Sequence, residues 1–274
     1  MAPPTESGSL ETYYKDHWVD IEPERLARYD RMFQLDDRRG DIILAPVGVQ
    51  EGETVVDFGC GPGFVAAQLA RLTGPGGHVH AVDVNEAFVT RAREVADASG
   101  RGGQITVHHA TDERVPLGDA SADRVYAKNV LEYVPDAAAV LAELYRVLRP
   151  GGRMVASDSD FGFVVIEPLA PPEVHELFSA AAPAFKEPHI GRKLRAAYRR
   201  GGFENVEVRV TAATDTSGFM RGVIENMLGY GLQFDRISQA RADELRHTID
   251  VAIEAGEYLM VLPQWWVTGT KPAG

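Results

Sequence analysis

A short apolar segment at residues 54–57 runs into the glycine-rich stretch Asp57-Phe58-Gly59-Cys60-Gly61-Pro62-Gly63, and a helical pattern begins near Phe64. Glycine has no Cβ, so the backbone of such a loop can approach a ligand closely. The free N–H groups of the following helix point at the same place. An acid at the end of the strand would repel a pyrophosphate but suits a cationic amine. The stretch therefore predicts a small-molecule binding loop.

A loop for a dinucleotide would read Gly-x-Gly-x-x-Gly, with the pyrophosphate at the helix N-terminus. Here the third glycine, Gly63, comes one residue early, and Asp57 closes the strand. Both features disfavour a nicotinamide-dependent oxidoreductase. The loop instead resembles the first motif of class I S-adenosylmethionine-dependent methyltransferases, whose usual form is acid-x-Gly-x-Gly-x-Gly.

The resemblance covers roughly residues 53–157, and its motifs follow in the expected order. It implies S-adenosylmethionine as the cofactor and methyl transfer as the reaction. It also implies a Rossmann-like sheet beneath the loop. The loop residues that it assigns to the cofactor site are Asp57, Gly59, Cys60, Gly61 and Gly63.

Two further motifs extend the cofactor site. Asp83, followed by Val84, matches the family acid that binds both ribose hydroxyls, because one carboxylate can accept from two vicinal hydroxyls. The alternative is that Asp83 only caps the next helix. Thr111, Asp112 and Glu113 stand in the stretch that resembles the adenine-binding motif. Since Thr111 replaces the usual acid, Asp112, or the backbone of Asp112 and Glu113, is expected to hold the adenine.

Asn129 closes the fourth expected strand, and the resemblance places the residues after it beside the methionine moiety and the transferred methyl. Asn129 is expected to contact the cofactor through its backbone. Glu132 either faces the cofactor or acceptor, or is a buried carboxylate bonded to backbone. A base helps if the acceptor carries a proton. The candidates are His189, whose loop should pass near the cap, Glu132 and His17.

Aromatic side chains outside the cofactor-binding segment are the better guide to the acceptor. As a group they suit an apolar or aromatic molecule and could shelter a cation, although each alone could simply pack the core. No histidine or cysteine cluster accompanies the alternating acids Asp158 and Asp160, so no metal is expected. The expected acceptor-binding residues are Tyr14, Trp18, Asp158, Phe161, Phe219 and Tyr230.

The elements that must position these residues alternate between strands and helices. Apolar strands are expected at residues 54–57, 78–83, 104–108, 123–127 and 153–157. Such alternation indicates a parallel sheet covered on both faces. The expected fold class is α/β, with a Rossmann-like sheet of seven mostly parallel strands, the last one antiparallel, and helices on both faces.

The chain is expected to divide into three parts. Residues 1–44 carry aromatics at helical spacing and predict an N-terminal helical lid. Residues 45–160 are the cofactor-binding core. Residues 161–274 complete the sheet and contain an inserted helical cap at about 211–257, which forms the acceptor site.

Composition narrows the class of protein. The 274 residues suit one large α/β domain with an insertion, and the net charge of −12 argues against nucleic acid as a partner. No apolar run reaches the roughly 20 residues that span a bilayer. The single cysteine, Cys60, allows no intramolecular disulfide and fits a cytoplasmic location. Residues 1–10, small and polar, favour a frayed terminus over a secretory signal.

The expected function is methyl transfer to a small aromatic or apolar acceptor, in bacterial secondary metabolism. Carbon or nitrogen is slightly favoured over oxygen, because no strong base is in view. One alternative is a cyclase or pericyclase that uses the cofactor only as a scaffold. Another is a protein or RNA methylase, which the acidic charge and the lid disfavour. A homo-oligomer is possible, because the lid helices could close a neighbour's active site.

Overall fold

The computed structural model describes residues 11–19, 21 and 23–274, so the frayed terminus expected at 1–10 lies outside the described residues. The described chain forms one sheet of eight strands. The strands are β1 (Thr54–Phe58), β2 (His78–Asp83), β3 (Ile105–His109), β4 (Ala122–Lys128), β5 (Leu148–Ser159), β6 (Val165–Glu167), β7 (Glu204–Asp215) and β8 (Leu259–Thr270).

Ten α-helices and four short 3-10 helices surround the sheet in the described residues. The α-helices are α1 (Tyr13–Val19), α2 (Pro23–Phe33), α3 (Asp37–Leu44), α4 (Phe64–Leu72), α5 (Glu86–Ala98), α6 (Ala137–Val147), α7 (Pro171–Ala181), α8 (Ile190–Arg200), α9 (Arg221–Gln233) and α10 (Gln239–Ala255). The 3-10 helices are η1 (Ala45–Val47), η2 (Gly102–Gln104), η3 (Phe161–Phe163) and η4 (Ala182–Ala184).

The strand order is β3-β2-β1-β4-β5-β8-β6, with β7 on the other edge of β8. Strands β1 to β5 are parallel, and β8 runs antiparallel to its three partners. The predicted α/β sheet with an antiparallel last strand is therefore confirmed. The eighth strand is the three-residue β6, which the sequence did not predict. The order reverses between β1 and β4, the position where open α/β sheets bind ligands.

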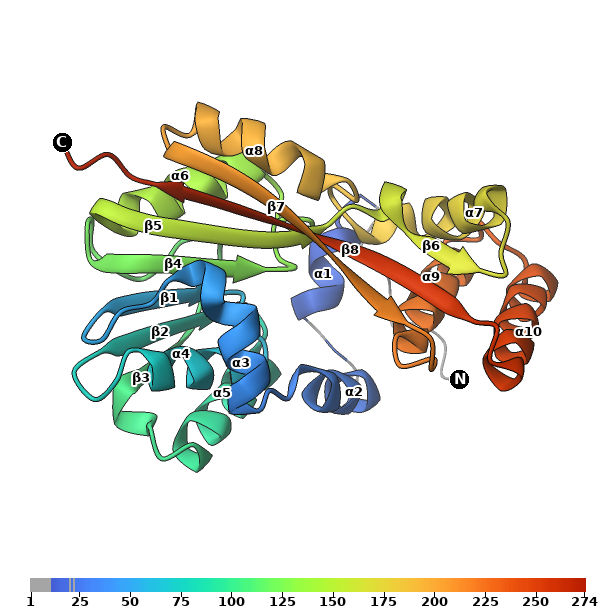
Figure 1. Ribbon diagram of the computed structural model, residues 1–274, viewed down its shortest axis with the longest axis horizontal. Coiled ribbons are helices and arrows are strands. Elements are labelled where there is room, and N and C mark those ends of the chain that lie inside the picture. Colours follow the sequence, from blue (N-terminus) through green and yellow to red (C-terminus); the bar gives the residue numbers. More distant parts are fainter. Residues whose placement is uncertain (1–10, 20, 22) are drawn as a thin grey trace.

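Helices cover both faces of the parallel strands because consecutive strand residues point to opposite sides. On β1, Val56 packs with α6 and α8, whereas its neighbour Val55 packs with α4 and α5. Figure 1 shows α6 and α8 on one side of the sheet and α3, α4 and α5 on the other. The central strand β1 thus buries four of its five residues, which explains its continuous apolar run in the sequence.

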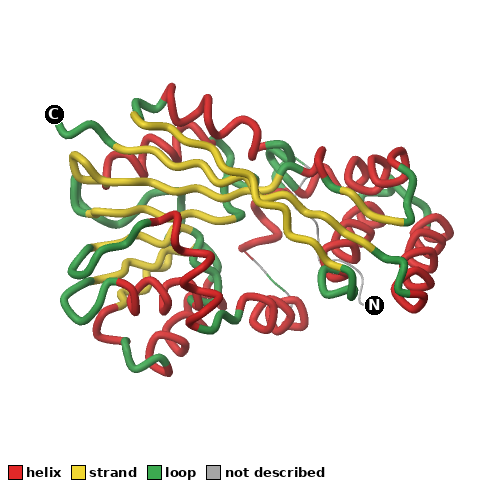
Figure 2. The backbone as a smooth tube through the Cα atoms, in the orientation of Figure 1, coloured by secondary structure: helices red, strands yellow, loops and turns green. Residues whose placement is uncertain are grey.

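Strands β7 and β8 form a long arm that leaves the parallel core. They pair from Glu204↔Thr270 to Asp215↔Met260, whereas β5 leaves β8 at Ser159↔Gln264. Beyond that point β6 takes the place of β5 on the edge of β8. Figure 2 shows the arm crossing from the core to the helices at the far end. The connection between β7 and β8 therefore lies at a distance from the parallel core.

The helical cap consists of α9 and α10, from that connection, together with α7. Their buried residues form a separate hydrophobic core with β6 and the start of β8. Residues 211–215, counted with the cap in the sequence analysis, are the end of β7. Several prolines after residue 160 interrupt the helical pattern of the sequence, yet Pro171 and Pro172 occupy the first turn of α7. Proline is tolerated there because its missing N–H would have no helical partner.

The lid helices α1 and α2 join the cofactor half of the sheet to the cap. On one side, Asn85 Nδ2 donates to the carbonyl of Trp18 at 2.8 Å, and Arg91 pairs with Asp30 at 2.6 Å. On the other side, the Arg28 guanidinium donates to Asn226 Oδ1 at 2.6 Å. The segment therefore bridges the two halves of the molecule.

We expect Asp215 to stabilise the turn that enters the cap. This buried carboxylate accepts the backbone N–H groups of Ser217 and Met220 at 2.9 and 2.7 Å. Although burial opposes it, these bonds lower the pKa of Asp215. Asp215→Ala should lower the free energy of unfolding by about 2 kcal/mol at pH 7, measured by urea denaturation.

A lowered folded-state pKa means that the stabilisation is present above the unfolded pKa and is lost as the pH falls through the folded one. The difference between Asp215→Ala and the parent should therefore shrink below about pH 4. The exposed Glu254 on α10 provides the control Glu254→Ala, which should change little. Equal stability of the two variants would show that Asp215 does not hold the turn.

Candidate active site

The glycine-rich loop turns sharply between β1 and α4. Gly59, Gly61 and Gly63 have φ values of 74°, 51° and 85°, in the left-handed region that favours glycine. A Cβ on Gly59 would lie 2.2 Å from Val130 Cγ2, and one on Gly63 would lie 2.8 Å from Ala92. A Cβ on Gly61 would meet no atom within 4 Å. The first and third glycines thus permit close packing, and the second leaves the loop surface open.

Asp83 connects this loop to the end of β2. Its Oδ2 accepts the N–H of Gly61 at 2.7 Å, and its Oδ1 accepts the N–H of Asn85 at 2.9 Å. Burial raises the pKa of Asp83, and the backbone bonds to Asn85 and Gly61 oppose that shift. Each carboxylate oxygen keeps a free lone pair. This geometry fits the predicted acceptance of two ribose hydroxyls.

Asp57 lies behind the loop at the end of β1. Its side chain is 3% exposed, and its Oδ2 is buried without a hydrogen-bond partner. Burial and the nearby Asp83 raise the pKa of Asp57 to about 8. A cationic amine at this position would stabilise the carboxylate and satisfy the unpaired oxygen. Burial also raises the pKa of the Cys60 thiol, which therefore stays protonated.

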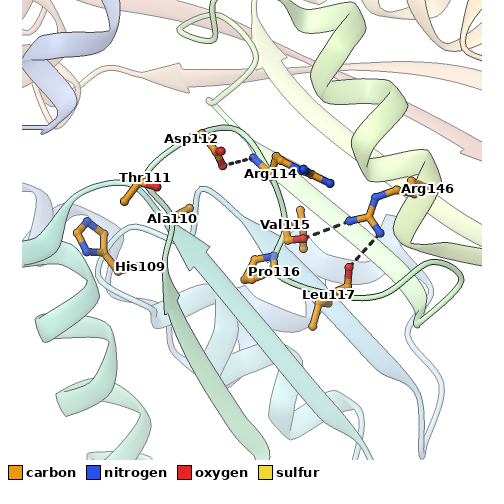
Figure 3. Close-up of a pocket in the computed structure, with 9 residues that line it drawn as sticks. All are labelled: His109, Ala110, Thr111, Asp112, Arg114, Val115, Pro116, Leu117 and Arg146. Atoms are coloured by element: carbon orange, nitrogen blue, oxygen red, sulfur yellow. Dashed lines mark hydrogen bonds between the residues drawn. The ribbon is translucent and has the colours of Figure 1, made fainter.

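The residues predicted for the adenine line a cavity of about 360 Å³ at the end of β3. Figure 3 shows Thr111 and Asp112 on the loop that arches over it, with Arg146 of α6 on the far side. Arg146 donates to the carbonyl of Leu117 at 2.9 Å and so fixes the end of this loop. The Asp112 carboxylate accepts the N–H of Arg114 at 2.9 Å.

Two further residues predicted for the cofactor site are Val84, which follows the ribose-binding candidate Asp83, and Glu113 of the adenine-binding stretch. Val84 is exposed, and its carbonyl lies 3.0 Å from Nε2 of His109, a residue that lines the cavity. Glu113 is half-buried and follows Asp112 in the loop. The structure therefore brings Val84 and the 111–113 segment to the same edge of the sheet.

The loop after β4 is held by Asp158 of β5. The Asp158 side chain is 0% exposed and accepts the N–H groups of Val130 and Glu132 at 3.1 and 3.4 Å. Asn129, at the start of this loop, has a φ of 52° and a buried Oδ1 without a partner. Asp158, predicted to bind the acceptor, thus contacts the backbone that carries Asn129 and Glu132.

Glu132 is 2% exposed, and its Oε2 has no hydrogen-bond partner. Burial, and then the neighbouring Asp158, raise the pKa of Glu132 well above its usual value, although Lys128 opposes this. The carboxyl therefore holds its proton at neutral pH and can donate a hydrogen bond. In this state it is a poor general base.

His17 of α1 is buried, and its Nδ1 lies against the carbonyl of Tyr13. Burial lowers the pKa of His17 to about 3. The ring is therefore neutral with its proton on Nδ1, because only a protonated Nδ1 can donate to the carbonyl. The lone pair of Nε2 has no partner.

His189 is 44% exposed, and it belongs to a group of polar contacts with Asp160 and Arg192. Its Nδ1 lies 3.1 Å from the carboxylate of buried Asp160, which also forms an ion pair with Arg192. Although burial opposes it, the hydrogen bond from Arg192 lowers the pKa of Asp160. Asp160 is thus ionised and fixes the His189 ring. These contacts orient His189 without bringing it to His17 or Glu132.

An aromatic cluster joins the lid, the cap and the loop after β4. The rings contact one another at centroid distances of 4.7 to 6.4 Å. Tyr133, which follows Glu132 in the chain, belongs to the cluster. Its ring centroid lies 5.7 Å from that of His17 and 4.9 Å from that of Trp18. The members are Tyr13, His17, Trp18, Tyr29, Tyr133, Phe161, Phe178, Phe185, Tyr230 and Phe234.

Three predicted acceptor residues, Trp18, Phe161 and Tyr230, are members of this cluster. Buried Tyr14 lies beside it, with Lys186 Nζ 5.0 Å from its ring. Phe219 is 69% exposed on the turn before α9 and takes no part in it. Sequence reasoning missed Tyr133, which stands directly after Glu132.

The residues around the loop fit S-adenosylmethionine. Asp83 offers paired acceptors to a diol, Gly61 leaves the loop open, and Asp57 and Asn129 bury unpaired oxygens suited to an ammonium group. When bound, S-adenosylmethionine supplies an electrophilic methyl group. In the part of the chain that the structure describes, no three His, Cys, Asp or Glu side chains group as metal ligands. No described helix is long and apolar enough to cross a membrane.

Comparison with known proteins agrees with this geometry. A family model described as a methyltransferase domain matches residues 56–156. The ubiquinone/menaquinone biosynthesis C-methyltransferase UbiE of Klebsiella pneumoniae is 30% identical over 177 residues, which are 58% of this chain and 70% of UbiE. The chain therefore belongs to the class I S-adenosylmethionine-dependent methyltransferases.

Two other similar proteins are named as N-methyltransferases. Dimethylglycine N-methyltransferase of Parasynechococcus marenigrum is 41% identical over 108 residues, 39% of this chain. The chain spans 42% and 38% of the length of two curated relatives that it matches, the second being this enzyme. Phosphoethanolamine N-methyltransferase 2 of Haemonchus contortus, solved with S-adenosyl-L-methionine, has a TM-score of 0.64 at 17% identity and shares the fold. That likeness covers 98% of this chain and 61% of the other.

We expect Asp83→Ala to weaken cofactor binding by about 100-fold, because two charge-assisted hydrogen bonds are lost. Calorimetric titration with S-adenosylhomocysteine measures this. The control is Glu86→Ala, which removes an exposed carboxylate from the first turn of α5 and should leave affinity unchanged. An affinity for Asp83→Ala within threefold of the parent would show that Asp83 only caps the helix.

We expect cofactor affinity to rise with pH up to about pH 8, because Asp57 is largely protonated below its pKa of about 8. An ammonium group favours the carboxylate, so binding at pH 7 should release up to about one proton. Titrations in two buffers of different ionisation enthalpy count that proton. Asp57→Asn should remove this release. If the parent and Asp57→Asn released the same number of protons, another group would be the source of the proton.

Proposed function

We propose that this enzyme methylates a small organic acceptor that is aromatic or apolar, at carbon or nitrogen rather than oxygen. The observation that carries the proposal is the aromatic cluster beside Glu132. Its rings come from α1, α2, α9, the segment 161–185 and the loop after β4. Such a surface favours apolar and aromatic ligands of limited size.

The lid supports a small acceptor over a polymer. Trp18 is held to Asn85, two residues after Asp83, and Tyr13 Oη donates to Gln233 of α9 at 2.8 Å. These bonds tie α1 between the cofactor loop and the cap. A protein or RNA segment would need an open groove there. The relatives named for C-methylation and for N-methylation of small molecules support the same class.

The residues around the cluster suit transfer by positioning. His17 is neutral, and Glu132 holds its proton, so neither is a strong base at neutral pH. Displacement at an activated methyl group needs mainly proximity, alignment and exclusion of water. A nucleophilic carbon or a neutral amine meets these conditions without prior deprotonation.

We expect methylated product when the purified protein is incubated with S-adenosylmethionine and indoles, phenols, amines and prenyl compounds. Mass spectrometry should show a product heavier by one methylene for at least one carbon or nitrogen acceptor. Asp83→Ala should give none at the same cofactor concentration, and Glu86→Ala should give the parent yield.

Two outcomes would contradict the proposal. Tight binding of S-adenosylhomocysteine with no product from any acceptor would favour a cyclase or pericyclase that retains the cofactor as a scaffold. Transfer of the methyl label to protein or RNA, with none to small molecules, would favour a macromolecule methylase.

A further inference from the structure

Arg25 of α2 lies among rings of the aromatic cluster without a counter-charge. Its guanidinium carbon is 4.8 Å from the Trp18 ring, 5.6 Å from Tyr29 and 5.8 Å from Tyr230. The Nη2 donates to the Tyr230 hydroxyl at 2.8 Å, and the buried Nε has no hydrogen-bond partner. Among residues 11–19, 21 and 23–274, no carboxylate pairs with Arg25.

Four other arginines of this protein have acidic partners. Arg91, Arg146, Arg221 and Arg241 each form ion pairs of 2.9 Å or less. A buried cation costs free energy unless it is paired and hydrogen-bonded. Arg25 has no such partner among the described residues, although it lies in the cluster where the acceptor is expected.

A second arginine extends the same face of α2. Arg28 stands three residues after Arg25, so the two side chains are neighbours on the helix. Its guanidinium donates to Asn226 Oδ1 at 2.6 Å and lies 5.9 Å from the Tyr29 ring. Asn226 and Tyr230 are one turn apart on α9. Two cations thus face two uncharged polar side chains across the lid–cap contact.

We infer that the acceptor carries an anionic group, a carboxylate or a phosphate, which Arg25 binds. This inference rests on the proposed small-molecule function and specifies its substrate class. The Nε–H and a neighbouring Nη–H form a fork that matches two anionic oxygens. Because the Tyr230 oxygen already accepts from Arg25, its O–H is free to donate to the same anion.

The surroundings make this site selective. Stacking against Trp18 fixes the guanidinium plane, so little rotamer entropy is lost when an anion binds. Two ionisable neighbours add no competing negative charge: burial lowers the pKa of His17, which is neutral, and raises the pKa of Tyr230. The acceptor would thus place its charge on Arg25 and its apolar part among the rings.

Binding of matched probes tests the inference without turnover. With saturating S-adenosylhomocysteine, calorimetry compares benzoate and phenyl phosphate with the neutral benzamide and phenol. The anions should bind more tightly than their neutral partners. Arg25→Gln should weaken anion binding by about 10- to 100-fold and change neutral binding less than about threefold. Arg25→Lys should restore part of the preference.

Arg31→Gln is the matched control, because Arg31 is an exposed arginine on the same helix. It should leave all four affinities unchanged, and each variant must bind S-adenosylhomocysteine like the parent. Loss of anionic and neutral probes alike in Arg25→Gln would show that Arg25 only fastens the lid. Equal parent affinity for acids and neutral partners would also overturn the inference. Methylation of a neutral acceptor with no anion preference would preserve the proposed function, whereas anion preference without product would contradict the proposed function alone.

Discussion

The buried carboxylate of Asp158 is the constraint on which the rest of the site depends. Removing a carboxylate from water costs several kcal/mol unless hydrogen bonds replace the lost hydration. Here the N–H groups of Val130 and Glu132 both contact Oδ1, whereas the buried Oδ2 has no hydrogen-bond partner among the described residues, and burial raises the pKa of Asp158 to about 7. The two bonds hold the loop after β4, which begins at Asn129 and carries Tyr133 into the aromatic cluster. One side chain therefore fixes the segment that joins Asn129 to Tyr133.

The two halves meet at the lid. Asn85 follows Asp83 and caps α5 through Phe88, and it also holds the end of α1 through the Trp18 carbonyl. The position of the lid thus depends on the short segment 83–85, which also contains the candidate ribose-binding residue Asp83. The cap reaches the lid because β7 and β8 extend beyond the parallel core and carry α9 with them. Hence the antiparallel arm, outside the parallel strands, positions the cap helix that contacts the lid.

The sequence predicted the family and the fold because the motifs of the cofactor half are local. Backbone geometry requires Gly59 and Gly63, and strand-end acids need only the strand pattern to place them. The acceptor half depends on contacts between distant segments, such as Tyr133 with Trp18 and Arg25 with Tyr230. Contacts between distant segments leave no signal in the hydrophobic periodicity of a sequence. The helix α7 was missed because prolines at its first turn looked like a break, and β6 is too short to show alternation.

The side chains around the aromatic cluster carry a positive charge, whereas the net charge of the whole chain is negative. The protein carries −12, yet the cluster holds Arg25, a neutral histidine and a protonated Glu132. A sulfonium beside this set would leave local positive charge uncompensated, which an anionic acceptor would offset. Because burial keeps Glu132 protonated, this carboxyl supplies neither a negative charge nor a base at neutral pH. Under the proposed function, the ligand would supply both the nucleophile and the missing negative charge.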